Sequence, residues 1–480
     1  MKPFRIIIMG SLIFLLLSSG IAYGAGWITK RLTNTSGSSM NPKIAVNGSV
    51  VYAVWQDDTL GNYEIYFRKS TDGGVAWQAA KRLTNNAGYS KSPAIAVDGS
   101  NVYIVWADST PGIYQIHFMK SADGGNHWQA ARVLTKNTTA IVGRPAIAVV
   151  NSSLYVVWHN NDEDMGGNLW ITFTKSVDGG AHWQATKFFS NTPNSVDSCN
   201  PAIAASDSGV YVVWEANTPG NNEIYLKKST NGGATWQALK RLTTNSGFSS
   251  SPAIAVMGSS VYVVWHDTTP GNDEIYFMKS ANKGATWQPS LRLTNNSGYS
   301  TAPALAVKDS SVYVVWYDNT PGNFEIYHRT STNGGADWQA VERLTKNSGS
   351  SASPSIGVGG SKIFVVWCDL TPGNYEIYLM YKKPAVNPIS VILPTASTVW
   401  VMGTTEKFKW QITEGAAGQA QTGTSGLMGS VETTASSLLT SPETLRHGQE
   451  AGSASLTDLL AIDKVKIDLY DESTLIVPHS

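Results

Sequence analysis

The chain has 480 residues, of which 42% are hydrophobic and 15% are charged. This mixture supplies a large core and is neither the composition of a disordered chain nor that of a multi-span membrane protein. The 35 basic and 35 acidic side chains cancel, so we expect no polyanion-binding surface and no nucleic acid partner. The 44 glycines, 17 tryptophans and 20 tyrosines favour an all-β repeat fold, which needs many turns and large flat side chains.

The first 24 residues have the pattern of a secretory signal peptide. Lys2 and Arg5 precede an apolar run over 6–17, and Ala22-Tyr23-Gly24 forms a small-x-small cleavage pattern. The alternative is an uncleaved N-terminal anchor, for which the apolar run is short. No later stretch could span a bilayer, so we expect a secreted or cell-surface protein with no transmembrane segment in the mature chain.

A unit of about 51 residues recurs seven times after this segment. Each copy holds short strands of the types A (PAIAV), B (VYVVW), C (EIYF) and D (WQAAKRLT). Because the B run is apolar on both faces, each sheet must be covered on both sides. Four-stranded sheets stacked around an axis provide that cover. The Trp that ends strand B stands at positions 55, 106, 158, 214, 265, 316 and 367.

The seventh unit lacks strand D, and a matching strand stands at the other end of the repeat. The segment from Trp27 to Thr33, WITKRLT, copies the D phrase directly after the signal peptide. We therefore predict an all-β fold with a seven-bladed β-propeller of four-stranded blades over residues 25–384. Pairing of the N-terminal strand into the last blade would close the ring and remove an open sheet edge.

Six units continue from strand C into Ser-x-Asp/Asn-x-Gly-x-x-Trp, first at residues 70–77. This motif resembles the Asp-box, or BNR repeat, of sialidases and related β-propellers, and the resemblance extends over about residues 27–384. An Asp or Asn followed by Gly can satisfy the amides of a C-to-D hairpin turn. A metal ligand or acid catalyst would rarely tolerate the exchange of Asp for Asn, so we predict a structural role for this position. Its six residues are Asp72, Asp123, Asp178, Asn231, Asn282 and Asn333.

The repeat departs from itself around blades two to four. The spacing from the B-strand Trp to the Asx of the box is 17 residues in five units but 20 in blade three, and the connections before the A strands of blades three and four are also longer. All these residues lie in B-to-C and D-to-A connections, which emerge on one face of a blade, so we expect the functional site there. The ligand-binding candidates are Arg144, His159, Asp162, Glu163, Asp164, Trp170, Asp197, Glu215, His266 and Tyr317.

These candidates would ring the mouth of a central channel and could bind a glycan or a peptide. We predict no cofactor and no dedicated metal site, although calcium could be held through Asp162 and Asp164. The alternative interpretation is that the longer loops carry only solvated charges.

The resemblance to sialidases also implies an enzyme of that type. Sialidases need three Arg for the substrate carboxylate, a Tyr nucleophile supported by Glu, and an Asp acid/base. Arg144 precedes Pro145 as in the family's Arg-x-Pro element, and Tyr317 and Glu215 are available in kind. Two further Arg are missing from this face, because Arg68 and Arg329 stand on C strands beside the Asp boxes, and seven blades depart from the family's usual six. We therefore expect a binding protein for glycan or extracellular protein ligands without catalytic residues. A sialidase-like exo-glycoside hydrolase is the alternative.

Residues 385–480 form a second region after a linker that breaks the repeat. Strand candidates at 389–393, 398–402, 406–412 and 464–470 resemble the small Ig-like sandwich of Ser/Thr-rich surface proteins. A low-complexity insert over about 413–463 interrupts them and should be disordered, or partly helical near 456–462. The two cysteines, Cys199 and Cys368, belong to blades four and seven. They are too far apart in the ring for a disulfide, so we expect free thiols.

Overall fold

The computed structural model describes residues 26–382, except 111, 136–140, 162–167, 191–196 and 218–219, together with 406–411, 428–433 and 465–470. The described part of the chain is all-β. No helix in it is long and apolar enough to cross a membrane. The predicted signal peptide, residues 1–24, lies outside the described residues.

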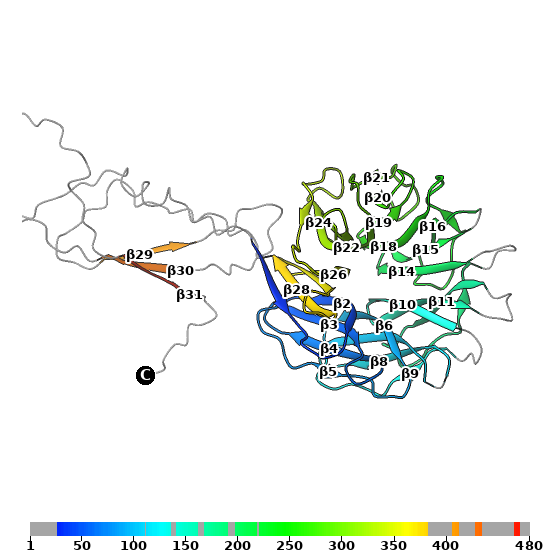
Figure 1. The fold of residues 1–480 in the computed structure, drawn as a ribbon, viewed down its shortest axis with the longest axis horizontal. Helices are drawn as coiled ribbons and strands as arrows, with labels where there is room; N and C mark the ends of the chain where they lie inside the picture. Colours follow the sequence, from blue (N-terminus) through cyan, green and yellow to red (C-terminus); the bar gives the residue numbers. More distant parts are fainter. Residues whose placement is uncertain are drawn as a thin grey trace, which may run out of the picture. The chain divides into compact units, whose positions relative to one another are not determined.

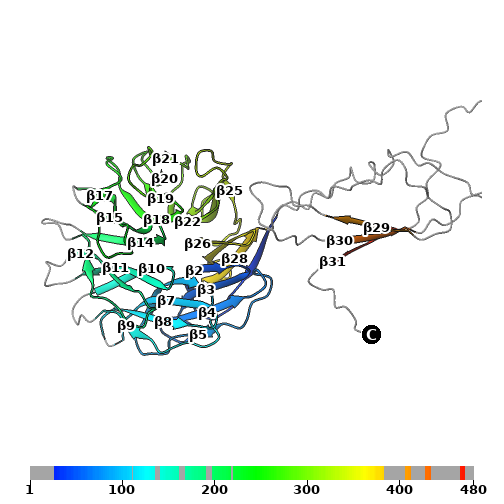
Figure 2. The ribbon, with the colours of Figure 1, turned by 180° about the vertical axis from the view of Figure 1, so that it is seen from behind.

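Seven four-stranded antiparallel sheets form the propeller, a compact unit over Gly26–Pro384. The predicted blade number and strand order are confirmed. The innermost strands surround the centre of the ring (Figures 1 and 2). Blades 1 to 3 consist of β2 (Ser39–Asn47), β3 (Val50–Asp57), β4 (Glu64–Ser70) and β5 (Lys81–Arg82); β6 (Ser90–Asp98), β7 (Asn101–Asp108), β8 (Gln115–Ser121) and β9 (Arg132–Val133); and β10 (Ile141–Val150), β11 (Ser153–Asn161), β12 (Leu169–Ser176) and β13 (Lys187–Phe188).

The remaining blades repeat this order. Blades 4 to 6 consist of β14 (Ser198–Ser206), β15 (Gly209–Ala216), β16 (Glu223–Ser229) and β17 (Lys240–Arg241); β18 (Ser249–Met257), β19 (Ser260–Asp267), β20 (Glu274–Ser280) and β21 (Leu291–Arg292); and β22 (Ser300–Lys308), β23 (Ser311–Asp318), β24 (Glu325–Ser331) and β25 (Glu342–Arg343). Blade 7 joins β26 (Ser351–Gly359), β27 (Lys362–Asp369) and β28 (Glu376–Lys382) to β1 (Trp27–Arg31).

The core lies between the blades, as the doubly apolar B strands predict. The seven Trp residues that end these strands are at most 2% exposed. Along β3, for example, Val51, Ala53 and Val54 are fully buried. Truncation of one such Trp to Ala should cost about 3 to 5 kcal/mol. The ring is therefore held together by blade-to-blade burial rather than by a single central core.

Each Asp box closes the hairpin between strands C and D with the same hydrogen bonds. In blade 1, Ser70 Oγ donates to Asp72 Oδ1 at 2.7 Å, Gly74 N donates to Ser70 Oγ at 2.8 Å, and Ala76 N donates to Asp72 Oδ1 at 2.9 Å. Gly73 and Gly74 have φ of 69° and 85°, a region that favours glycine. Asn282 accepts from Thr286 N in the same geometry as the carboxylates.

Ring contacts and lysines join neighbouring blades, and the joint between blades 1 and 2 has both. A C-strand Phe of one blade packs edge-to-face on the Asp-box Trp of the next, as in Phe67 and Trp128 with centroids 5.1 Å apart. Lys69 Nζ donates to Gly124 O at 2.7 Å, and Lys81 Nζ donates to Asn126 O at 2.8 Å. Each Asp box is therefore held by the preceding blade.

The joint between blades 6 and 7 is built differently because blade 7 has no Asp box. Trp27 of β1 occupies the place of the box Trp and packs edge-to-face on His328, which replaces the Phe, with centroids 5.5 Å apart. Glu342 replaces the lysine of strand D and accepts from Trp27 Nε1 at 2.9 Å. Its other oxygen lies 3.4 Å from Lys382 Nζ and 3.7 Å from His328 Nδ1. We call Trp27, His328, Glu342 and Lys382 the closure joint.

Pairing of β1 with β28 confirms the predicted closure of the ring. The register runs from Trp27 opposite Lys382 to Arg31 opposite Tyr378. The outermost strand of blade 7, β1, thus comes from the start of the propeller sequence, whereas its antiparallel partner β28 comes from the end.

The C-terminal region contains a three-stranded antiparallel sheet, considered by itself. It consists of β29 (Glu406–Gln411), β30 (Met428–Thr433) and β31 (Val465–Tyr470), with β30 in the middle. The strands β29 and β31 coincide with two predicted strands, whereas β30 lies inside the predicted low-complexity insert, where we expected no strand. The other two predicted strands lie outside the described residues.

Candidate functional site

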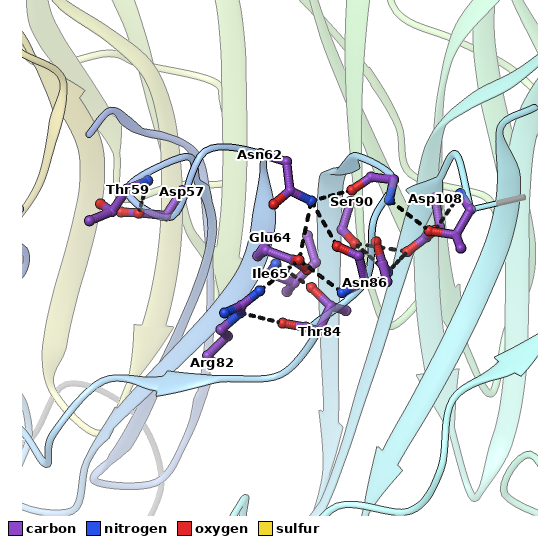
Figure 3. A network of polar contacts seen from close by, with 12 residues as sticks. Asp57, Thr59, Asn62, Glu64, Ile65, Arg82, Thr84, Asn86, Ser90 and Asp108 are labelled. Carbon is purple, nitrogen blue, oxygen red and sulfur yellow. Dashed lines mark hydrogen bonds and ion pairs between the residues drawn. The ribbon is translucent and has the colours of Figure 1, made fainter. Parts of the chain in front are cut away.

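A buried polar network organises the face that carries the B-to-C and D-to-A connections. Glu64 Oε1 accepts from Arg82 Nη2 at 2.8 Å and from Asn86 N at 3.0 Å. Asn86 Nδ2 in turn donates to Asp108 Oδ2 of the next blade at 2.9 Å (Figure 3). A buried Glu and its Arg pair in the same way in blades 4 to 7. These repeated charges are scaffold, as their repetition predicts.

This network is interrupted in blades 2 and 3. Gln115 and Trp170 stand where the other blades have the buried Glu, and Val133 and Phe188 stand where they have the Arg. Trp170 is only 6% exposed. Trp170 was a ligand-binding candidate because it departs from the repeat. The structure shows that Trp170 and Phe188 take the positions of the buried Glu and its Arg, so apolar side chains replace this ion pair in blade 3.

Two sets of side chains line the end of the ring on this face, and we call them together the inner rim. One set is the residue before the proline of each innermost strand, and the other is the residue after each B-strand Trp. The residues before proline lie at a register shift of the strand and all have φ between 46° and 53° although none is glycine. They are Asn41, Ser92, Arg144, Asn200, Ser251, Ala302 and Ser353, and the residues after Trp are Gln56, Ala107, His159, Glu215, His266, Tyr317 and Cys368.

Several residues after Trp are used to tie neighbouring blades together. Glu215 Oε1 accepts from Asn200 Nδ2 at 2.9 Å, and Oε2 accepts from Ser251 N of the next blade. Gln56 does the same in blade 1, accepting from Asn41 Nδ2 at 3.1 Å and from Ser92 N at 2.8 Å. Glu215 is 5% exposed, so its carboxylate is a buried blade link whose oxygens already have donors.

Two cations also lie in the rim region, and one of them links two blades. Arg144 is exposed, and its Nη1 donates to the amide oxygen of Asn200. Lys43, directly after the proline of β2, stands where the other six blades have Ala or Ser. Its side chain reaches solvent, yet enclosure by the protein and then the charge of Arg144 lower the pKa of its ammonium. Within the described part of the chain, neither cation forms an ion pair.

His159 lies on the same side of the rim. Burial and then the charge of Arg144 lower its pKa to about 4, so the ring is neutral near pH 7. Its Nδ1 is buried without a hydrogen-bond partner. A Cβ on Gly143 would lie 2.8 Å from His159 Nε2, which shows how closely the imidazole packs over the opposite strand. Lys43, Arg144 and His159 thus belong to blades 1 and 3 and leave polar capacity unused.

The remaining candidates are spread around the ring. Asp197 is exposed, and its Oδ1 accepts from Leu169 N at 3.0 Å. His266 Nδ1 accepts from Ala302 N at 3.4 Å, and burial lowers the pKa of His266 against the opposing charge of Asp273. Tyr317 packs edge-to-face on Phe324 with centroids 5.0 Å apart. The structure therefore groups Arg144 with His159 and Glu215 and places His266 and Tyr317 in blades 5 and 6.

The predicted insertion cannot be added to this geometry, because Asp162, Glu163 and Asp164 lie outside the described residues. Among the residues that are described, no three His, Cys, Asp or Glu side chains gather to hold a metal ion. The cysteines are free, as predicted. Cys199 Sγ donates to Glu215 Oε1 at 3.2 Å, and burial raises the pKa of both thiols.

The fold and the repeated turns define this molecule as an Asp-box propeller. A family model described as a BNR repeat-like domain matches residues 38–263. Just under half of the chain is therefore similar to BNR-repeat, or Asp-box, proteins.

Relatives share parts of the chain at low identity. A curated relative, the xyloglucanase Xgh74A of Acetivibrio thermocellus, is 24% identical over 227 residues, which are 43% of this chain and 26% of that protein. A protein of unknown function from Dyadobacter fermentans has a TM-score of 0.48 at 12% identity over 74% of this chain and 99% of its own. A Trypanosoma rangeli sialidase has a TM-score of 0.47 at 11% identity over 85% of this chain and 74% of its own. Structural likenesses at this level carry no information about activity.

Sequence reasoning missed Lys43 and the strained rim backbone. Lys43 could have been found as the one charged residue at a position that is otherwise Ala or Ser. The positive φ before each proline has no comparable signal, because the residues that adopt it include Asn, Ser, Arg and Ala.

Proposed function

We propose that this protein is an exported glycan-binding propeller whose ligand contacts the inner rim at blades 1 and 3. Lys43 and Arg144 would donate hydrogen bonds and positive charge to it, and the neutral ring of His159 would lie beside them. The signal-peptide pattern supports export. The similarity to a protein named as a xyloglucanase supports a glycan rather than a protein ligand.

The observation that carries this proposal is the unused polar capacity of these three side chains. At blades 1 and 4, Gln56 and Glu215 are consumed by bonds to the neighbouring blade. Arg144 has only an amide oxygen, Lys43 has no ion pair among the described residues, and His159 Nδ1 has no partner. Two cations that lie close enough for the charge of Arg144 to lower the pKa of Lys43 suit a hydroxyl- or carboxylate-bearing ligand.

Binding without hydrolysis is favoured by the carboxylates of the rim. Most glycoside hydrolases need two carboxyl groups on either side of the scissile bond, and a sialidase needs a Tyr nucleophile supported by Glu together with an Asp acid/base. Glu215 is the single carboxylate among the fourteen inner-rim residues, and it is buried and hydrogen-bonded. The rim also offers one Arg, because Arg68 and Arg329 donate to backbone carbonyls beside the Asp boxes.

The test is a binding titration of the full chain against a glycan array, followed by calorimetry with xyloglucan oligosaccharides and with the best array ligand. Arg144→Ala should weaken binding at least tenfold, which is about 1.4 kcal/mol. Lys43→Ala introduces the residue that five other blades carry, so it should weaken binding without loss of stability. Arg132→Ala is the matched control, because Arg132 lies on outer strand β9 and donates to Ala181 O in the Asp box of the next blade.

Release of reducing sugars is measured on the same samples. Hydrolysis that Arg144→Ala abolishes would replace the binding proposal by the glycosidase alternative. Equal affinities of the wild type and both rim variants would remove the inner rim as the ligand site.

A further inference from the structure

Three exposed aromatic side chains stand at equivalent positions of the repeat. Tyr89, Phe248 and Tyr299 are 46%, 50% and 52% exposed. Each is the last residue before the innermost strand of its blade, on the face that carries the inner rim. Single exposed apolar residues are ordinary, but the recurrence of a large ring at one structural position is not explained by chance exposure.

The backbone of each aromatic residue is held by the turn of the following B-to-C connection. Tyr89 N donates to Ser109 Oγ, Phe248 N donates to Thr268 Oγ1, and Tyr299 N donates to Asn319 Oδ1, each at 2.7 Å. The same three turn residues donate their own N–H to the carbonyl of the aromatic residue at 3.0 to 3.4 Å. The rings are therefore carried on a fixed backbone rather than on free loop tips.

A glycine before each ring allows this close approach. A Cβ on Gly88 or on Gly298 would lie 2.5 Å from the backbone nitrogen of Thr110 or Thr320. No side chain fits there, so the position of the following aromatic residue is fixed by backbone contact. Pre-organisation of this kind reduces the entropy that a binding surface loses when it engages a ligand.

The scaffold itself does not need an aromatic residue at this position. Ser38 and Ser350 occupy it at the start of blades 1 and 7, and their carbonyls accept the same bond, from Asp58 N at 3.3 Å and from Leu370 N at 3.0 Å. Since serine supports the same backbone, the three aromatic rings are not required for the fold of this connection. Their role must lie in what they present to solvent.

The surroundings of the rings fit a saccharide better than a protein. Each ring follows a glycine in a turn rich in Asn and Ser, such as Asn85-Asn86-Ala87-Gly88, so the chain beside each ring is polar. Lys91 Nζ lies over the Tyr89 ring, 4.6 Å from its centre, and 5.0 Å from the centre of the Tyr63 ring, so a cationic donor lies against this platform. A sugar ring offers a small apolar face bordered by hydroxyls, which matches one aromatic ring with polar neighbours.

We propose that Tyr89, Phe248 and Tyr299 form separate stacking platforms for the sugar rings of a neutral polysaccharide that runs over the loop face. This inference deepens the proposed glycan-binding function, because it makes the ligand a polymer that engages several blades. Several weak platforms on one frame raise the apparent affinity for a polymer without raising that for a short fragment.

The test compares xyloglucan polymer with its short oligosaccharides, using affinity electrophoresis and calorimetry on the full chain. The variants are Tyr89→Ser, Phe248→Ser and Tyr299→Ser, singly and combined, since serine is native to this position in two blades. Each single change should weaken polymer binding several-fold, and the triple variant should weaken it at least tenfold. Binding of the short oligosaccharides should change less than twofold. Phe188→Ser removes a ring that is 39% exposed on outer strand β13 and serves as the control.

The outcomes separate this inference from the proposed function. A triple variant that binds polymer like the wild type overturns the platforms, and the rim is then judged by Arg144→Ala alone. Loss of oligosaccharide and polymer binding together in the triple variant, with an unchanged melting temperature, would place the rings in the primary site and overturn the separate platforms. A wild type that binds neither xyloglucan nor any other neutral polymer of a cellulose, mannan and β-glucan panel overturns them as well.

Discussion

The closure joint offers a direct test of how the ring is held shut. Changing Glu342 to Lys restores the residue type that strand D carries in blades 1, 3, 4 and 7. A repeat consensus would predict stabilisation. The structure predicts the opposite, because blade 7 has no Asp box to receive the lysine, and Trp27 Nε1 and Lys382 depend on the carboxylate.

The magnitude follows from the contacts that are lost. The hydrogen bond from Trp27 to a charged acceptor contributes about 1.5 to 3 kcal/mol. The partly exposed pair with Lys382 adds about 0.2 to 1 kcal/mol, and two like charges replace it. We therefore expect Glu342→Lys to lower the free energy of unfolding by roughly 2 to 4 kcal/mol. At about 2 cal/mol/K per residue, that corresponds to a melting temperature roughly 3 to 5 °C lower.

The assay is thermal unfolding at pH 7 followed by near-ultraviolet circular dichroism. Glu342→Gln keeps an oxygen for Trp27 and should show a smaller loss. Lys240→Gln is the control at the equivalent position of a regular joint, where Lys240 Nζ donates to Ala285 O at 3.3 Å on the surface, and its effect should stay within about 0.5 kcal/mol. A Glu342→Lys variant that melts within 1 °C of the wild type, or above it, would refute the reasoning.

Three further results are expected. Asn282→Asp should melt like the wild type, whereas Asn282→Ala removes the acceptor of Thr286 N and should cost about 1 kcal/mol; a large loss in the Asp variant would contradict the structural role of the box. The folded pKa of His159, about 4, is below its unfolded value of about 6.5, so its contribution to stability is complete above pH 6.5 and is lost as the pH falls toward 4. His159→Gln should therefore flatten the fall in melting temperature between pH 7 and 4, and parallel curves would contradict this. Burial raises the pKa of Cys368 to about 11 and also raises that of Cys199, so both thiols should react with a disulfide reagent at pH 8 only after unfolding, and rapid labelling of the folded protein would count against this.

Much of the fold could be predicted because the same packing problem is solved seven times. A Trp at the end of each B strand and an Asx-Gly turn after each C strand mark every blade independently. The copy of the D phrase at Trp27 identifies the closing strand without any information on distance. Because each strand and turn pattern occurs in several copies, the repeats can be compared with one another, which is not possible in a single irregular domain.

The site was less predictable because irregularity has more than one cause. Trp170 breaks the pattern, yet it packs inside blade 3 in place of a buried Glu. Glu215 also breaks the pattern, yet it performs the same blade-linking task as Gln56. Which polar groups remain free depends on hydrogen bonds between blades, and these depend on the strained backbone before each proline. A sequence shows that a residue departs from the repeat, but it does not show whether the hydrogen-bonding groups of that residue are already bonded to a neighbouring blade.

The register of the closing strand also decides how the ring responds to force. Trp27 and Lys382 lie opposite each other at one end of the β1–β28 ladder, so a pull on the two flanking segments would load the ladder bonds one after another instead of all together. Sequential loading is the weak direction of an antiparallel pair. Trp27 and Lys382 both contact Glu342 at that same end. The Glu342 carboxylate thus contacts both strands at the end of the ladder where mechanical separation would begin, and it should raise the force needed to open the ring there.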